Sequence, residues 1–321
     1  MNQINILFCA THAELALPSL AKIIESNHHI VAVVTAPDTR SGRGRKPAIS
    51  PIKALAQQHS LTVLQPTSLS SDQEYERWKS LSFDLMIVAG YGLILPKRII
   101  LLPRYGCINV HPSLLPRWRG ASPVQAAISN QDKTTGVSII RLNEKMDAGD
   151  LILQQTLTLT GHEKTPELMA SLADMGCHLL MQAIDLIIHE RAVYKAQDDT
   201  QATYCTKLSK QDAVLDFNQT ALALYAQIRA LQPWPSSEVT LTDGTVMKIK
   251  SASFHPIHED TAHSPGILIK TDRDQGMLIA CGQDAIWLHT IQMPNKPMMP
   301  AYQAQLGYPK LFALKKRIIS Q

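Results

Sequence analysis

The sequence predicts an α/β protein in which a doubly wound, Rossmann-like domain precedes a small, OB-like β-barrel. Three observations lead to this fold class. The chain has 321 residues, more than one hydrophobic core usually holds, and this length favours two domains. Its first part alternates short apolar runs with segments of helical period. Its last part carries short strand-like runs at regular spacing, which are typical of small barrels.

The first part contains five apolar runs that we expect to be strands. They span residues 4–10, 30–36, 83–90, 107–111 and 136–142. Most of them are continuously apolar rather than alternating, which is typical of strands buried on both faces of a parallel sheet. Segments of helical period occur at 15–26, 51–59, 122–130 and 165–189. This alternation predicts a doubly wound sheet whose active site lies beyond the carboxyl ends of its strands.

The chain changes in character after Arg191. Residues 192–210 hold few large apolar side chains and are typical of a linker between a domain at 1–191 and a second one at 211–321. A helix is predicted at 222–231, before Pro233-Trp234-Pro235. The Asp243-Gly244 turn predicts a hairpin, and further strands are expected at 267–270, 277–281 and 286–291.

The composition indicates a cytoplasmic protein with reduced thiols. No uninterrupted apolar run reaches the roughly 18 residues of a membrane helix, and residues 1–18 lack the basic start and apolar core of a signal peptide. The five cysteines lie far apart and form no C-x-x-C pair, and their odd number argues against a disulfide framework. We therefore expect no membrane association.

The net charge of +4 is too small for a general nucleic-acid binder, so an anionic partner has to meet a local basic patch. One glycine-containing segment after Asp38 holds four cations: Arg40, Arg43, Arg45 and Lys46. Arginines in a mobile segment favour phosphate contacts, and a solvated surface loop is the alternative. Lys248 and Lys250, which share one strand face, allow the same two interpretations.

A polar pair ends the predicted strand at 107–111. Asn109 and His111 are two residues apart, so their side chains share one face of the strand, which Pro112 terminates. An amide there can stabilise a developing oxyanion, and an imidazole can take the proton of an amine. The pair indicates acyl transfer; an asparagine and a histidine that satisfy loop backbone groups are the alternative.

A second polar segment, Met146-Asp147-Ala148-Gly149-Asp150, follows the strand predicted at 136–142. A carboxylate close to an imidazole increases its basicity and fixes its tautomer, so Asp147 suits His111 as an orienting partner. Asp150 competes for this role, and an ordinary acidic turn is the alternative.

Together these segments resemble the folate-dependent formyltransferases. The likeness rests on Asn109-x-His111, Ser113-Leu114-Leu115-Pro116, Arg117-Trp118-Arg119-Gly120 and Asp147-x-Gly149-Asp150. The resemblance implies a catalytic trio of Asn109, His111 and Asp147. It also implies 10-formyltetrahydrofolate as the formyl donor and co-substrate, contacted by Ser113, Leu114, Leu115 and Pro116.

The basic segment resembles one branch of that family, whose acceptor is methionyl-initiator tRNA and whose basic loop reaches into the acceptor stem. The likeness covers residues 36–38, 42–46, 50–53, 204–211 (YCTKLSKQ) and 229–235 (RALQPWP). It implies formylation of the free α-amine of the charged tRNA for translation initiation. It also implies that the barrel and the four basic residues, Arg40, Arg43, Arg45 and Lys46, bind tRNA. The sequence indicates no obligate protein partner.

Two segments depart from the family pattern. Ala10-Thr11-His12 stands where the family has Gly-Thr-Pro, and residues 295–321 match only loosely.

Other functions lack their sequence signatures. A nicotinamide dehydrogenase needs G-x-G-x-x-G after its first strand, and residues 42–46 lack the spacing of a phosphate loop. The histidines and cysteines form no ligand spacing of the H-x-x-x-H or C-x-x-C kind, so we expect no metal. A non-catalytic RNA-binding protein would give no function to Asn109, His111 and Asp147. A formyltransferase for a nucleotide-linked amino sugar is the nearest alternative, and the basic segment argues against it.

Overall fold

The computed structural model describes residues 3–41, 46–257 and 263–320, and the chain divides into two compact units. The first unit comprises Met1–Pro123, Thr134–Thr158 and Leu168–Cys205, and the second comprises Val124–Lys133, Leu159–Glu167 and Thr206–Gln321. Much of the predicted linker at 192–210 therefore belongs to the first unit. The domain bounds 1–191 and 211–321 stay predictions about which parts of the chain fold independently.

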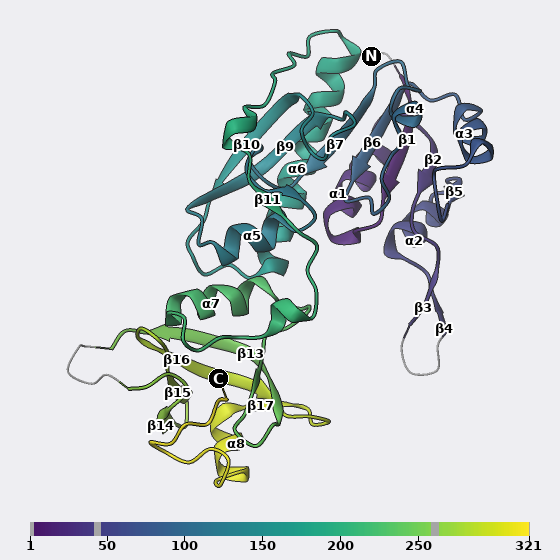
Figure 1. Ribbon diagram of the computed structural model, residues 1–321. Helices are drawn as coiled ribbons and strands as arrows, with labels where there is room; N and C mark the ends of the chain where they lie inside the picture. Colours follow the sequence, from purple (N-terminus) through teal and green to yellow (C-terminus); the bar gives the residue numbers. More distant parts are fainter. Residues whose placement is uncertain (1–2, 42–45, 258–262, 321) are drawn as a thin grey trace. The chain divides into compact units, whose positions relative to one another are not determined.

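A seven-stranded sheet forms the centre of the first unit, in the order β10-β9-β7-β6-β1-β2-β5 (Figure 1). The parallel strands are β1 (Asn5–Ala10), β2 (His29–Val34), β5 (Val63–Leu64), β6 (Leu85–Ala89) and β7 (Cys107–His111). β9 (Thr134–Arg141) and β10 (Leu151–Thr158) run antiparallel to their neighbours. The strand predicted at 136–142 thus belongs to this sheet but is antiparallel to β7, although its apolar run is typical of a parallel strand. The interior of β9 is buried throughout, so its apolar run does not differ from that of a central parallel strand.

Helices cover both faces of this sheet (Figure 1). They are α1 (Ala13–Ile24), α2 (Pro51–Gln58), α3 (Asp72–Lys79), α4 (Lys97–Ile100) and α6 (Thr165–Ile188), whereas α5 (Pro123–Ser129) belongs almost wholly to the second unit. On one face, α6 packs so closely that a Cβ atom at Gly176 would lie 3.0 Å from Cγ1 of Val110 in β7. On the other face, Cys107 of β7 shares a buried cluster with Trp78 of α3 and Ile99 of α4. Because side chains alternate along a strand, Asn109 and His111 point to the same side as Cys107, away from α6.

Helix α6 is long and apolar enough to cross a membrane, judged by length and composition. More than half of its most apolar window, 56%, is buried inside the protein. The core helix of a globular protein passes the same test, and the close packing of Gly176 on β7 gives α6 that role here.

The second unit contains an antiparallel sheet with the strand order β12-β13-β16-β15-β14, and β17 pairs with β16. Its elements are α7 (Ala221–Ala230), β12 (Glu238–Thr240), β13 (Val246–His255), β14 (Leu268–Asp272), β15 (Gly276–Ala280), β16 (Ala285–Gln292), β17 (Met298–Pro300) and α8 (Ala301–Gly307). The predicted hairpin lies at β12 and β13, and the other predicted strands coincide with β14, β15 and β16 to within two residues.

The last residues of the described chain join the two edge strands of this sheet. Leu241, directly after β12, bridges to Ile319, and Ile267, directly before β14, bridges to Arg317. Both bridges are antiparallel, and the backbone N–H of Ile318 donates to the Gly266 carbonyl oxygen at 2.9 Å. The sheet thus closes into a small barrel, as expected. Its interior is apolar and includes Ile249, Leu288 and Ile318.

Candidate active site

The predicted amide and imidazole, Asn109 and His111, lie in the carboxyl-terminal half of the buried strand β7. Asn109 is 8% exposed and His111 is 4% exposed, so both side chains are largely removed from water. They share the face that carries Cys107, but lie further along the strand towards its carboxyl end. The prediction that they occupy one face of a buried strand is confirmed.

Asp147 reaches the same place from the loop between β9 and β10. Because β9 is antiparallel to β7, with Arg141 opposite Ile108, this loop starts beside the amino end of β7. It therefore folds back along β7 to bring Asp147 to Asn109 and His111. The close backbone path at Gly149, where a Cβ atom would overlap the Arg141 carbonyl oxygen, makes this return possible.

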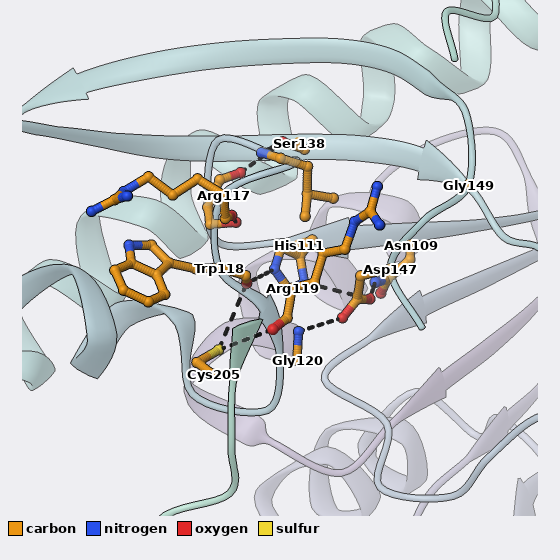
Figure 2. Close-up of polar contacts among 12 residues, drawn as sticks. Asn109, His111, Arg117, Trp118, Arg119, Gly120, Ser138, Asp147, Gly149 and Cys205 are labelled. Atoms are coloured by element: carbon orange, nitrogen blue, oxygen red, sulfur yellow. Dashed lines mark hydrogen bonds and ion pairs between the residues drawn. The ribbon is translucent and has the colours of Figure 1, made fainter. Parts of the chain in front are cut away.

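The three predicted catalytic side chains meet around one carboxylate oxygen (Figure 2). Asp147 Oδ1 lies 3.6 Å from His111 Nδ1 and accepts a 3.4 Å hydrogen bond from Asn109 Nδ2. The other oxygen, Oδ2, accepts from the backbone N–H of Gly120 at 2.8 Å. Asp150, the competing carboxylate, has its carbonyl oxygen engaged by the Arg141 N–H at 2.8 Å, and no contact with His111 occurs among the described residues.

The second imidazole nitrogen fixes the tautomer of His111. Nε2 lies 2.9 Å from the carbonyl oxygen of Trp118, which can only accept, so Nε2 carries a hydrogen. In the neutral ring the basic lone pair is therefore on Nδ1, the nitrogen that faces Asp147. A proton added at Nδ1 would be stabilised by the carboxylate.

The run from Ser113 to Pro116 is shaped by hydrogen bonds to β9 and β10. The hydroxyl of Ser138 donates to the Ser113 carbonyl at 2.6 Å and accepts from the Leu115 N–H at 3.1 Å. Gln154 Nε2 donates to the Leu115 carbonyl at 2.8 Å. The Ser113 hydroxyl itself donates to the Arg117 carbonyl at 2.7 Å. These bonds explain the path of the run; a folate contact of Ser113, Leu114, Leu115 and Pro116 stays a prediction.

The structure adds two residues to the site: Arg119, which the sequence motif contained without a role, and Gln197, which no motif contained. Arg119 of β8 (Arg119–Gly120) is 2% exposed, and its guanidinium donates to Gln197 and Asp199 of the predicted linker. Burial opposes its charge, but hydrogen bonds to Asp199 and Tyr204 outweigh this effect and raise the pKa of Arg119 above its ordinary value. Gln197 in turn contacts the loop that carries Asp147. A glutamine in a polar linker has no local pattern that would single it out.

Gly120 joins the trio to the strand pair β8–β11, where β11 (Tyr204–Cys205) lies parallel to β8. Its φ is +117°, and a Cβ atom there would overlap the carbonyl oxygen of Cys205. Its N–H also holds Asp147 Oδ2. The position therefore requires glycine for both backbone conformation and space.

We expect Gly120→Ala to lower the free energy of unfolding by about 1–3 kcal/mol, the scale of a strained backbone position. The turnover of the site should fall with it, because a shifted backbone N–H at position 120 no longer holds the Asp147 carboxylate in the same place. Gly161→Ala is the matched control: its φ is +87°, but nothing lies within 4 Å of the added Cβ atom. Chemical denaturation of both variants measures the difference. Equal losses in the two would show that the crowding at Cys205 has no cost.

The basic segment is only partly described by the structure. Arg40 lies in β3 (Thr39–Ser41) and Lys46 in β4 (Lys46–Ala48), which pair as an antiparallel hairpin. Arg43 and Arg45 lie outside the described residues. The base of the hairpin is fixed by Asp38, whose carboxylate accepts from Lys53 Nζ at 2.6 Å and from Gln65 Nε2 at 3.0 Å. These hydrogen bonds hold the pKa of Asp38 below its ordinary value.

One group of metal-ligating side chains occurs among the described residues, on α6. It comprises Asp174, Cys177 and His178. The thiol of Cys177 donates to the Asp174 carbonyl at 3.0 Å, and His178 Nδ1 lies 2.9 Å from the same oxygen. Burial also raises the pKa of the Cys177 thiol, which opposes the thiolate that a metal needs. The expectation of no metal stays a prediction.

Comparison with known proteins gives these features a class. Residues 4–184 match the family model described as formyl transferase, and residues 207–309 match the model described as formyl transferase, C-terminal domain. The chain therefore has the fold of an enzyme that transfers formyl groups. A methionyl-tRNA formyltransferase of Methylococcus capsulatus is 40% identical over 296 residues, which cover 92% of this chain and 94% of that relative. The chain belongs to the formyl transferase family and, within it, to the methionyl-tRNA formyltransferases.

Two solved structures share the fold. HypX from Aquifex aeolicus in complex with tetrahydrofolic acid has a TM-score of 0.65 at 15% identity, over 100% of this chain and 51% of HypX. WlaRD, a sugar 3N-formyl transferase crystallised in the presence of dTDP and 5-N-formyl-THF, has a TM-score of 0.63 at 16% identity. That alignment covers 92% of this chain and 100% of WlaRD. At these identities the likeness concerns the fold alone.

Proposed function

We propose that this protein transfers the formyl group of 10-formyltetrahydrofolate to the free α-amine of methionyl-initiator tRNA and so supplies N-formylmethionyl-tRNA for translation initiation. The near full-length likeness to a methionyl-tRNA formyltransferase carries the choice of acceptor. The buried contact of Asn109, His111 and Asp147 carries the chemistry. We place the reaction in the cytoplasm and propose that it needs no metal.

The donor set of the site fits a formyl oxygen. Among the described residues, the amide of Asn109 makes one hydrogen bond, and this bond is long, 3.4 Å to Asp147. An N–H of this amide can therefore be directed at a substrate oxygen. The folate co-substrate supplies a formyl group that is already activated for transfer to an amine. Ser113, Leu114, Leu115 and Pro116, which adjoin the catalytic strand, are the proposed folate contacts.

Each member of the trio then has one proposed task. Asn109 Nδ2 donates to the formyl oxygen while negative charge develops on it. His111 accepts the proton of the attacking amine at Nδ1, because Nε2 already carries the hydrogen that faces Trp118. Asp147 Oδ1, 3.6 Å from Nδ1, stabilises the resulting imidazolium. Gly120 holds the carboxylate in place through its N–H.

The test is a formylation assay with purified protein, 10-formyltetrahydrofolate and charged initiator tRNA, followed by detection of formylmethionine. A nucleotide-linked amino sugar serves as the competing acceptor, because a sugar formyl transferase shares the fold. We expect formylmethionyl-tRNA to accumulate and the sugar to stay unmodified. Formylation of the sugar alone would reject the proposed acceptor.

We further propose that the barrel unit and the basic segment bind tRNA, with Arg40, Arg43, Arg45 and Lys46 as contacts. Arg43 lies between Gly42 and Gly44 in the sequence, and a guanidinium is a planar fork suited to a phosphate or a base edge. Phosphate contacts release counterions and make binding depend on salt. The proposal therefore predicts that these four residues contribute both to the affinity for tRNA and to the decrease of that affinity with rising salt concentration.

Replacing Arg43 by Leu should weaken formylation of tRNA, and replacing Arg40, Arg45 and Lys46 together should flatten the dependence of binding on salt. Activity on a small methionine ester should stay constant, because the ester has no phosphates. Arg77→Leu, which removes an exposed arginine of α3, controls for the loss of one charge. If the variants keep the wild-type tRNA activity and salt slope, the segment is a solvated loop.

A further inference from the structure

The backbone of Asp147 needs support from outside its own loop. Its φ is +49°, a left-handed backbone conformation that residues other than glycine adopt at an energetic cost. Its carboxylate has to stay beside His111 Nδ1 in this conformation. The direct bond from Gly120 holds the carboxylate but does not hold the backbone.

Gln197 provides a backbone contact. Its Nε2 donates to the carbonyl oxygens of Asp147 and Gly149, both at 2.7 Å. Its Oε1 accepts from Nε of Arg119 at 3.1 Å and from a terminal nitrogen of the same guanidinium at 2.8 Å. Carbonyls only accept and a guanidinium only donates, so the orientation of the amide is fixed by its neighbours. Both ends of the side chain are thus matched to their partners.

Arg119 holds Gln197 from the opposite side. The guanidinium also donates to Asp199 Oδ1 at 2.7 Å. In the β8–β11 pair, Arg119 lies opposite Tyr204 and its neighbour Gly120 lies opposite Cys205. The segment that follows α6 is therefore connected to Asp147 in two ways. Its Gln197 contacts the Asp147 backbone directly, and its Cys205 pairs with Gly120, whose N–H donates to the Asp147 carboxylate.

We propose that Gln197 is a positioning residue for the formyl-transfer reaction: its amide sets the backbone of Asp147 so that the carboxylate stays beside His111. The reaction that it serves rests on the proposed function. Its assignment rests on the four hydrogen bonds of its amide.

Two substitutions separate the two ends of the side chain. Gln197→Glu keeps an acceptor for Arg119 but turns a carboxylate oxygen towards the carbonyls of Asp147 and Gly149, where two acceptors repel. Gln197→Leu removes both sets of bonds. Gln201→Leu is the matched control, because Gln201 is an exposed glutamine of the same segment that donates to Asp198 at 2.7 Å.

The expected loss in kcat is about 10- to 100-fold for Gln197→Leu and at least as large for Gln197→Glu, the scale of a misplaced catalytic group. The KM for tRNA should stay within about twofold, because Gln197 lies with the trio and is no proposed tRNA contact. In a variant that already carries Asp147→Asn, Gln197→Leu should cost less than about threefold more, because groups that act as one unit are not additive. Gln201→Leu should match the wild type.

A spectroscopic readout needs no substrate. The ¹⁵N shifts of the His111 ring report the contact of Nδ1 with a carboxylate, and at fixed pH we expect Gln197→Leu to move them in the direction that Asp147→Asn does. If the wild type fails to formylate tRNA, the proposed function fails while the ring shifts still decide the role of Gln197. Wild-type ring shifts in a folded Gln197→Leu protein would overturn the inference. The inference would also be overturned if Gln197→Leu lowered kcat by the same factor in the Asp147→Asn protein as in the wild type.

Discussion

We expect His111→Ala to lower kcat by about 10²- to 10⁴-fold, the range that a positioned general base contributes. The ring is the group that we propose takes the amine proton, and no other imidazole contacts Asp147 among the described residues. Folate affinity should be largely retained, because His111 acts on the proton and the proposed folate contacts are at 113–116. Stopped-flow or quench measurement of a single turnover isolates this step from product release.

Two further variants sharpen this experiment. His111→Gln keeps an amide donor that can reach the Trp118 carbonyl but offers no basic nitrogen, so its loss should be close to that of His111→Ala. His59→Ala, at the exposed end of α2, serves as the control for losing a histidine. Free imidazole added to His111→Ala should restore part of the rate. Wild-type turnover in a folded His111→Gln protein would assign the proton to another acceptor.

Asn109→Ala is expected to lower kcat by about 10²- to 10³-fold, as the loss of one oxyanion donor does in other acyl transfers. The fold should survive, because the side chain of Asn109 makes one long hydrogen bond among the described residues and its neighbours in β7 remain. Asn109→Asp tests the need for a hydrogen-bond donor at nearly unchanged side-chain shape. An ionised aspartate at position 109 cannot donate, and it places a second carboxylate beside Asp147. Its loss should be at least as large as that of Asn109→Ala.

Asn130→Ala is the control, because Asn130 is an exposed asparagine whose amide caps the end of α5 by donating to Ala126. Equilibrium binding of a folate analogue distinguishes loss of catalysis from loss of the site. A kcat within a few-fold of the wild type in a folded Asn109→Ala protein would contradict the role of Asn109 as a donor to the formyl oxygen.

Strand β7 shows how far the sequence alone leads. Its apolar run and the period-two spacing of Asn109 and His111 predict a buried strand with both groups on one face, and the structure has this arrangement. The direction of β9 does not follow from its sequence, because a strand buried on both faces carries the same residues in either direction. That direction decides where the loop of Asp147 begins.

Other features depend on contacts that have no local pattern. Gln197 is 50 positions from Asp147, and only the folded chain brings its amide to that carbonyl. Helix α3 was not predicted because its residues are mostly charged and a single one, Trp78, is buried. A helix with a single buried apolar residue has no apolar periodicity in its sequence. Its start is marked by a different feature, the N-cap hydrogen bond from the Glu74 N–H to the Ser71 side chain.

The closure of the barrel by its last strand-like segment has a consequence for how the protein is made. The edge of β14 and the end of β12 beyond its bridge to Val214 stay unpaired until Arg317 and Ile319 have been synthesised, because these residues bridge to Ile267 and Leu241, next to the two strands. Open edges with unpaired backbone groups invite pairing with other chains. The second unit therefore passes through an interval during translation in which most of its sheet exists but its edges are unprotected, whereas the strands of the first unit's sheet precede it along the chain. Chaperone binding during synthesis would be needed most in that interval.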